Sequence, residues 1–137
     1  MSDDSFPVVI YHNPDCATSR NVVAMVEAAS YTPTIIEYLQ TGWTIPQLED
    51  LMAVMNATPR DLLREKGTPA MELGLLDADA TPDLILREMV AHPILVNRPI
   101  VATPKGVKLC RPSQVVLELL DKHPPSFTKE DGGIVIP

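Results

Sequence analysis

The chain has 137 residues, of which 45% are hydrophobic and 21% charged, and its formal net charge is −7. This composition argues against disorder and predicts a folded domain with a hydrophobic core. No apolar run approaches the ~18 residues of a membrane span, and the acidic start MSDDSFP lacks the basic and apolar regions of a signal peptide. The negative charge also disfavours nucleic acid as a partner, because binding phosphate groups needs a basic face.

The cysteine content indicates the cellular setting. Two cysteines, Cys16 and Cys110, are too few for a secreted disulfide scaffold. No group of histidines and cysteines has the spacing of a zinc site, so we expect no metal. We therefore expect a reducing, cytoplasmic environment.

The first part of the chain predicts a strand, a helix and a second strand. Residues 7–11 form a short apolar run typical of a buried strand, and residues 18–29 carry apolar side chains at helical spacing. Residues 34–39 are typical of a second strand. A strand, a helix and a strand of this length predict parallel pairing with a right-handed crossover.

The middle of the chain, residues 44–91, is predicted to be helical. Helix start signals occur at Thr44, Thr58 and Thr81, since each is a residue type that caps helices and precedes an apolar pattern. The second and third of these threonines are each followed by proline, which favours the first turn of a helix. Gly67 is expected to end the second helix.

The pattern changes again near the C-terminal third. Residues 99–103 and 107–110 flank a Pro-Lys-Gly turn at 104–106 and predict a β-hairpin. A last helix begins near residue 112. The tail from residue 123 to 137 is expected to be extended and packed on the domain.

The order of these elements, apart from the middle helices, is that of a thioredoxin-like domain. We therefore predict an α/β fold with a mixed four-stranded sheet flanked by helices. Residues 7–43 and 92–122 would form the thioredoxin-like core, and residues 44–91 a helical insertion before the last hairpin. Together with the tail at 123–137 they would make a single domain of residues 1–137.

The segment YHNPDCATSRN is the strongest candidate for a reactive site. Cys16 follows a strand and a tight loop and opens a helix, where free backbone N–H groups and the helix dipole favour a thiolate. Ser19 occupies the position of the second cysteine in a CxxC redox pair, so Cys16 has no neighbour with which to form a disulfide. The alternative is a buried structural cysteine, which the polar, turn-forming neighbours disfavour.

Two residues near Cys16 could add to the stabilisation of a thiolate. His12 lies four residues before it and can reach it only if the loop curls back, whereas Arg20 lies four residues after it on the same helix face. A phosphatase-like loop of Cys, five residues and Arg is excluded, because Val22 stands at the sixth position after the cysteine.

Arginines at three other places are candidate anion ligands. Arg98 precedes Pro99, and in a thioredoxin-like domain the proline at this point is usually cis and faces the redox cysteine, so we expect Arg98 to point to Cys16. Arg111 ends the other hairpin strand, and Arg64 lies in the helical middle. Converging guanidinium groups would bind a tetrahedral oxyanion through charge-assisted hydrogen bonds. A solvated surface charge is the alternative for any one of them.

Several other residues are interpreted as structural. Cys110 lies in an apolar strand and is expected to be a buried thiol, since a resolving cysteine would need a Cα atom within ~7 Å of that of Cys16 or a mobile segment. Arg60 and Arg87 have the pattern of ordinary helix-surface residues, and Trp43 that of a packing or loop residue.

Taken together, seven segments resemble the arsenate reductases of the glutathione/glutaredoxin-coupled type, from about residue 8 to residue 132. These segments are YHNPDCATSRN, PTIIEYL, DLLREK, ELGL, HPILVNRPIV, LCRPSQVVLE and FTKEDG. By this resemblance Cys16 is the nucleophile that forms a thiol-bound arsenate, and His12 influences its thiolate. Ser19 and Arg20 match the polar residues after the nucleophile, which we assign to substrate binding.

The resemblance also assigns the arginines and the reaction partners. Arg64, Arg98 and Arg111 match the three arginines that bind the oxyanion and the arsenic adduct, and Cys110 matches a cysteine that the family does not need. The implied substrate is arsenate, with glutathione as co-substrate, glutaredoxin as partner and no tightly bound cofactor. We also expect a monomer that binds neither nucleic acid nor a membrane.

Two other functions are weighed against this enzyme. Relatives of the fold that regulate transcription suggest a non-enzymatic, partner-binding module, but such a module has no need of Arg64, Arg98 and Arg111 together. An iron–sulfur-binding monothiol glutaredoxin fits less well, because its CGFS motif differs from the CATS found here and the helical insertion is foreign to it.

Overall fold

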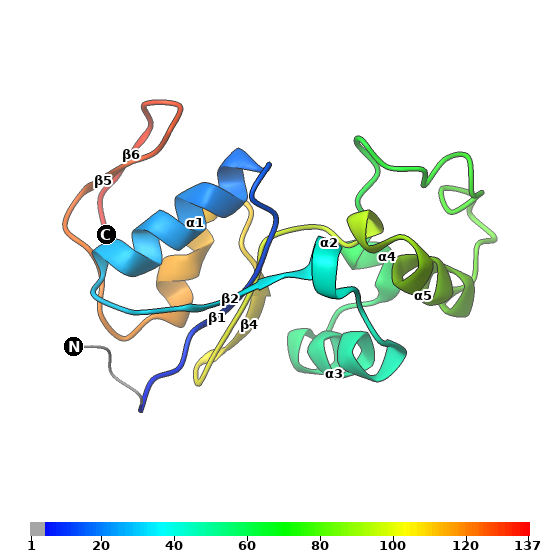
Figure 1. Cartoon of the computed structure of the whole chain (residues 1–137), viewed down its shortest axis with the longest axis horizontal. Helices are drawn as coiled ribbons and strands as arrows, with labels where there is room; N and C mark the ends of the chain where they lie inside the picture. Colours follow the sequence, from blue (N-terminus) through cyan, green and yellow to red (C-terminus); the bar gives the residue numbers. More distant parts are fainter. Residues whose placement is uncertain (1–4) are drawn as a thin grey trace. The chain divides into compact units, whose positions relative to one another are not determined.

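The computed structural model describes residues 5–137, so residues 1–4, the start of the segment used to argue against a signal peptide, lie outside it. The chain divides into two compact units (Figure 1). The first comprises the residues up to Glu37 together with Arg98–Pro137, and the second comprises Tyr38–Asn97. None of the helices in residues 5–137 combines the length and the apolar character needed to cross a membrane. The assignment of residues 1–137 to one domain stays a prediction.

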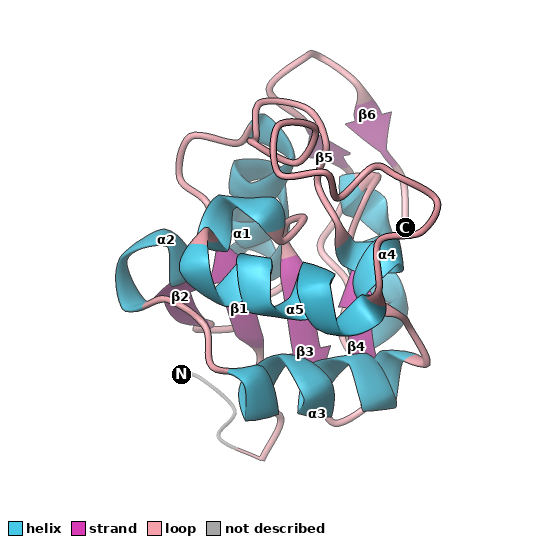
Figure 2. Ribbon diagram, turned by 90° about the vertical axis from the view of Figure 1, so that its right-hand side faces the viewer, coloured by secondary structure: helices cyan, strands magenta, loops and turns pink. Residues whose placement is uncertain are grey.

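The first unit is built on a mixed sheet of four strands. They are β1 (Val9–His12), β2 (Thr34–Glu37), β3 (Ile100–Thr103) and β4 (Gly106–Leu109). Figure 2 shows them side by side in the order β2-β1-β3-β4. β1 is parallel to β2, whereas β3 is antiparallel to both β1 and β4. The predicted fold class, a mixed four-stranded sheet flanked by helices, is confirmed.

Two helices pack against each other and help to form the core of this unit. They are α1 (Ala17–Ala28) and the 3-10 helix η2 (Ser113–Leu119). The core combines side chains of β1, β3, α1, η2 and the tail; its members include Ile10, Val22, Met25, Val26, Val101, Cys110, Val116 and Leu119. Because successive residues of an extended chain point to opposite faces, Ile10 of β1 and Val8 just before this strand both lie in the core. The first turn of α1 is thereby fixed beside the end of β1.

The tail adds a second, two-stranded antiparallel sheet to the first unit. It consists of β5 (Phe127–Thr128) and β6 (Ile134–Val135), with Phe127 paired to Val135. Val135 is a member of the core cluster, and Phe127 packs against it. The loop between these two strands is consequently held at a defined place on the unit.

The second unit consists mainly of helices. They are α2 (Tyr38–Thr41), α3 (Ile45–Met55), α4 (Pro59–Leu62), α5 (Pro82–Ala91) and the 3-10 helix η1 (Pro93–Leu95). The three predicted start signals are confirmed: Thr44, Thr58 and Thr81 each cap a helix by accepting a backbone hydrogen bond. Capping boxes complete the first two of these starts.

Several predicted boundaries are wrong. The second strand ends at Glu37 instead of residue 39, because Tyr38 begins α2. Helix α4 ends at Leu62, well before Gly67. Leu63 forms an isolated β-bridge with Val96, and the N–H of Arg64 donates to the carbonyl of Leu95 at 2.7 Å. These pairings use the backbone groups that a longer helix would need.

Candidate active site

The loop before α1 fixes the position of Cys16. Cys16 is the N-cap residue of α1, with φ −104° and ψ 119°, and its N–H donates to the carbonyl of Asn13 at 3.1 Å. The side-chain Oδ1 of Asn13 accepts the N–H of Asp15 at 2.9 Å, which closes a tight turn. The cysteine is only 8% exposed. The sulfur therefore lies at the positive end of the helix, and little of the residue is exposed to solvent.

The two hairpin arginines lie beside this sulfur. Arg98 precedes β3 and Arg111 follows β4, and because these strands are antiparallel both residues lie at the same end of the hairpin. The Nη1 atom of Arg111 lies 3.6 Å from the Sγ atom of Cys16 and donates to the carbonyl of Arg98 at 3.0 Å. The Arg98–Pro99 and Arg111–Pro112 peptide bonds are both cis. Sequence reasoning anticipated only the first of these.

These contacts set the protonation of the thiol. Burial raises the pKa of Cys16. Hydrogen bonds from the Arg98 side chain, the Ser19 backbone and the Arg111 side chain lower this pKa, and together they outweigh the effect of burial. The charge of Arg98 also lowers it, and the resulting pKa is about 7 instead of 9.0. A substantial fraction of Cys16 is therefore thiolate at neutral pH, which is the reactive form.

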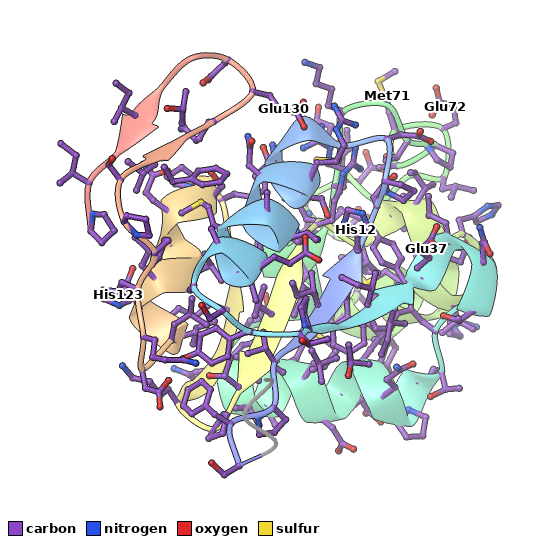
Figure 3. The ribbon with its side chains drawn as sticks, turned by 60° about the vertical axis from the view of Figure 1, so that its left-hand side comes forward. His12, Glu37, Met71, Glu72, His123 and Glu130 are labelled. Atoms are coloured by element: carbon purple, nitrogen blue, oxygen red, sulfur yellow. The ribbon has the colours of Figure 1, made fainter. Side chains whose placement is uncertain are left out.

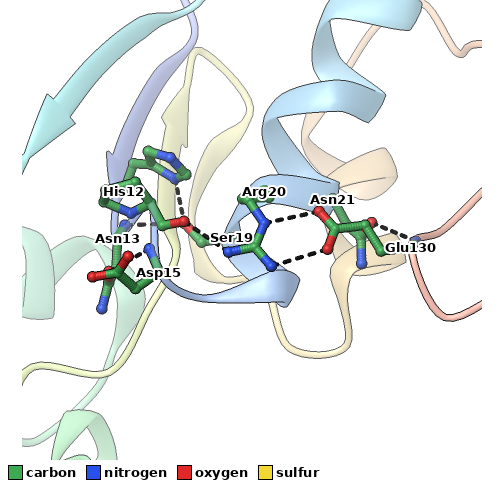
Figure 4. A network of polar contacts seen from close by, with 8 residues as sticks. His12, Asn13, Asp15, Ser19, Arg20, Asn21 and Glu130 are labelled. Atoms are coloured by element: carbon green, nitrogen blue, oxygen red, sulfur yellow. Dashed lines mark hydrogen bonds and ion pairs between the residues drawn. The ribbon is translucent and has the colours of Figure 1, made fainter.

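His12 lies at the end of β1 and contacts Ser19. Its Nδ1 is 2.5 Å from Ser19 Oγ, and the same oxygen accepts the N–H of Asn13 at 3.1 Å (Figure 4). His12 pairs with Glu37 across β1 and β2, and Figure 3 shows the two residues on these neighbouring strands. Burial lowers the pKa of His12 most, Arg20 lowers it further and Glu37 opposes them, so the ring is neutral at pH 7. The ring thus supports the fully buried Ser19, whose backbone acts on the sulfur.

Arg20 contacts the tail and the cysteine loop, and its assignment to substrate binding stays a prediction. Its Nε and Nη2 atoms donate to the two carboxylate oxygens of Glu130 at 2.9 and 3.0 Å. Its Nη1 atom donates to the carbonyl of Pro14 at 2.8 Å. The guanidinium is therefore bound by a carboxylate of the tail and by the cysteine loop. Glu130 lies in the segment FTKEDG, and nothing in the sequence alone indicates that it pairs with Arg20.

Arg64 lies in the second unit, after α4. Its Nε donates to the carbonyl of Lys66 at 3.1 Å, and its own carbonyl accepts the hydroxyl of Thr68 at 2.6 Å. Its convergence with Arg98 and Arg111 stays a prediction.

Cys110 has the environment of a structural thiol. It is fully buried in the core of the first unit, and burial raises its pKa to about 12. It is therefore a poor nucleophile, in contrast to Cys16. Among residues 5–137, no three histidine, cysteine or acidic side chains are grouped so that they could hold a metal ion.

The comparison with known families decides the affiliation of the chain. The sequence pattern of the ArsC family matches residues 11–119. The chain belongs to the ArsC family. This match covers the cysteine loop, the helical segment and the arginine-bearing hairpin, and it confirms the resemblance that the seven sequence segments indicate.

Named members of the ArsC family align over nearly the whole chain. An arsenate reductase of Synechocystis is 59% identical over 130 residues, covering 94% of this chain and 93% of the relative. An arsenate reductase of Escherichia coli is 49% identical, covering 94% of this chain and 92% of the relative. A solved arsenate reductase of Vibrio cholerae superposes with a TM-score of 0.79 at 35% identity, covering 84% of this chain and 98% of that one.

Proposed function

We propose that this chain reduces arsenate to arsenite, with Cys16 as the nucleophile. The observation that carries the proposal is the position of the Cys16 sulfur 3.6 Å from the guanidinium of Arg111, together with a pKa of about 7. Such a site combines a thiolate with fixed positive charge for an oxyanion. The relatives named arsenate reductase at 59% and 49% identity support the choice of substrate.

The first chemical step is a substitution at arsenic. Cys16 attacks As(V), an arsenic–sulfur bond forms and one arsenic–oxygen bond breaks. The departing oxygen takes up protons and leaves as water, so no electron is transferred in this step. Arg98 and Arg111 hold the remaining oxyanion charge beside the sulfur, and Arg64 is the third arginine that the resemblance assigns to the same role.

The second stage needs two external thiols. Reduction of As(V) to As(III) takes two electrons. Ser19 occupies the position of the second cysteine of a CxxC pair, so Cys16 has no neighbouring thiol that could supply them. Cys110 is buried with a pKa of about 12. Glutathione attacks the arsenic of the adduct, so that a second arsenic–sulfur bond forms and another arsenic–oxygen bond breaks with loss of water. A glutaredoxin thiolate then attacks the glutathione sulfur and forms a mixed disulfide, and the arsenic–sulfur bond that breaks leaves its electron pair on arsenic, which becomes As(III). The two thiols supply both electrons, arsenite leaves with an oxygen from water, and Cys16 returns as a thiolate.

The dependence on glutathione favours a cytoplasmic location, where this thiol is kept reduced. The reaction requires no tightly bound cofactor in this chain, since the electrons come from diffusing thiols.

The decisive experiment is a coupled assay. NADPH oxidation is followed with arsenate, glutathione, glutathione reductase and glutaredoxin. The wild type should consume NADPH only when arsenate and both thiols are present, and Cys16→Ser should be inactive with an unchanged circular dichroism spectrum. Cys110→Ala is the matched control and should remain active. A folded wild type with Cys16 reduced that consumes no NADPH would contradict the proposal and favour a partner-binding module.

A further inference from the structure

The tail of the chain contacts the cysteine loop through one fork of hydrogen bonds. Both carboxylate oxygens of Glu130 accept from Arg20, at 2.9 and 3.0 Å (Figure 4). The third nitrogen of Arg20 donates to the carbonyl of Pro14. A bidentate arginine–carboxylate pair fixes the plane of the guanidinium as well as its distance. The carbonyl of Pro14, two residues before Cys16, is therefore linked to a residue more than a hundred positions later.

Glu130 is itself held by its surroundings. Its backbone N–H donates to Oδ1 of the buried Asn21 at 3.0 Å, so the tail is joined to α1 at two consecutive helix residues. The loop is closed by the Lys129 N–H, which donates to the carbonyl of Gly133 at 2.8 Å, and by the Gly132 N–H, which donates to Lys129 at 3.0 Å. Gly132 has φ 89°, a conformation that glycine adopts without strain.

The contacts of Arg20 restrict what else this side chain can do. Three of its nitrogens are directed to Glu130 and Pro14, although its charge still interacts with the Cys16 thiolate. The same pairing lowers the pKa of Glu130, so the carboxylate stays ionised throughout the neutral range. An arsenate anion at this guanidinium would have to displace a carboxylate that already binds it in a fork.

We propose that Glu130 and Arg20 form a strut that holds the cysteine loop in its reactive geometry, with both acting as positioning residues. The inference rests on the proposed arsenate reduction for its kinetic consequence, and it replaces the expectation that Arg20 binds the substrate. Without the strut, the Pro14 carbonyl is free to move and the turn that presents Cys16 loosens. The tail thereby helps to position the nucleophile Cys16, although Glu130 lies more than a hundred residues after it in the chain.

The kinetic test separates a strut from a substrate ligand. Glu130→Gln removes the charge that holds the fork, and kcat should fall about 3- to 10-fold while the KM for arsenate stays within about twofold, because a misplaced nucleophile slows the chemical step. If Arg20 instead binds arsenate, freeing it from Glu130 should lower the KM. That result, or unchanged kinetics, overturns the proposal. Arg20→Lys keeps the charge but not the fork, and should reproduce the loss of kcat.

A second measurement tests the strut without any arsenate. Hydrogen exchange at the amides of Asp15 and Cys16 reports on the turn directly, since both donate to Asn13. Exchange should be faster in Glu130→Gln than in the wild type. The matched control is Glu118→Gln, which breaks another exposed ion pair of the same unit, with Lys108 at 3.0 Å. Equal exchange in Glu130→Gln and Glu118→Gln overturns the strut, whereas faster exchange in an enzyme that reduces no arsenate overturns only the proposed function.

Discussion

The Nη1 atom of Arg111 lies 3.6 Å from the sulfur of Cys16 and 3.0 Å from the carbonyl oxygen of Arg98. One guanidinium thus contacts the nucleophile and braces the backbone of the second arginine beside it. The guanidinium supplies positive charge directly beside the thiol. The reactivity of Cys16 should therefore follow its own protonation.

The pH dependence of thiol alkylation tests this relationship. The pKa of Cys16 is lowered from 9.0 to about 7, so the thiolate fraction and the iodoacetamide rate should rise with pH through about 7 and level off above about pH 8. Below the midpoint the thiol is protonated and the rate should fall. The buried Cys110, with a pKa of about 12, contributes little to this reaction.

Arg111→Gln should move the midpoint of this curve upward, because it removes one donor to the thiolate. At pH 7 the alkylation rate should fall about 3- to 10-fold, since one pKa unit changes the thiolate fraction by up to tenfold. Lys108→Gln removes a positive charge from the same hairpin and should leave the midpoint in place. A midpoint near 9 in the wild type would mean that the arginines do not act on the free thiol.

Substitution of the arginines should weaken arsenate binding. Arg98→Gln and Arg64→Gln are each expected to raise the KM for arsenate by about tenfold or more, because a charge-assisted hydrogen bond contributes about 1.5–3 kcal/mol. Arg98→Gln should in addition raise the midpoint of Cys16 alkylation. Arg87→Gln, on the exposed side of α5, is the control and should leave the KM unchanged. If Arg64→Gln behaves like this control, Arg64 is no substrate ligand.

Much of the fold could be predicted because its signals are local. Three helix starts are predicted by threonines that can cap them, and each side chain accepts a backbone N–H three residues later; these are Thr44, Thr58 and Thr81. The end of α4 could not be predicted, since it depends on Leu63 pairing with Val96, far along the chain. Gly67 is a local signal for a helix end, but α4 ends earlier because of the pairing between Leu63 and Val96.

The site shows the same division. Cys16, Arg98 and Arg111 could be selected from their places at the ends of elements, because strand ends converge in a sheet. The partner of Arg20 could not, since Glu130 reaches it only through the packing of the tail, which no spacing in the sequence encodes. The bond between His12 and Ser19 depends similarly on the exact turn of the loop between them.

Arg60 is exposed on α4, as its pattern predicts, but its side chain also binds three backbone carbonyls. Its Nη1 atom donates to the carbonyl of Leu75 at 3.2 Å, and its Nη2 atom donates to those of Asp77 and Ala80 at 3.1 Å each. Arg60→Ala should lower the free energy of unfolding by about 1–2 kcal/mol, since charged hydrogen bonds to these carbonyls are lost at a partly exposed site. Urea unfolding followed by circular dichroism measures the change.

The control for Arg60→Ala is Arg87→Ala, whose effect should stay within about 0.5 kcal/mol, as is usual for a surface substitution. Equal stabilities of the two variants would show that the three carbonyl contacts contribute nothing measurable.

The absence of a second cysteine near Cys16 can be tested by supplying one. Ser19→Cys places a thiol three residues after Cys16 at the start of α1, the spacing at which CxxC motifs form disulfides. After mild oxidation the variant should lose iodoacetamide labelling at Cys16 and regain it with dithiothreitol, whereas the wild type should stay labelled. Arsenate turnover of the variant should become dependent on prior reduction, because the new thiol removes Cys16 from the reaction by closing a disulfide.

Ser19→Ala separates the new thiol from the lost hydroxyl. The hydroxyl accepts the buried N–H of Asn13 and contacts His12, so both substitutions should destabilise the fold by about 1–3 kcal/mol. Only Ser19→Cys should respond to oxidation. If its Cys16 stays fully labelled after oxidation, the loop does not hold the two positions within disulfide distance. Serine would then have no role in keeping the arsenic adduct open to external thiols.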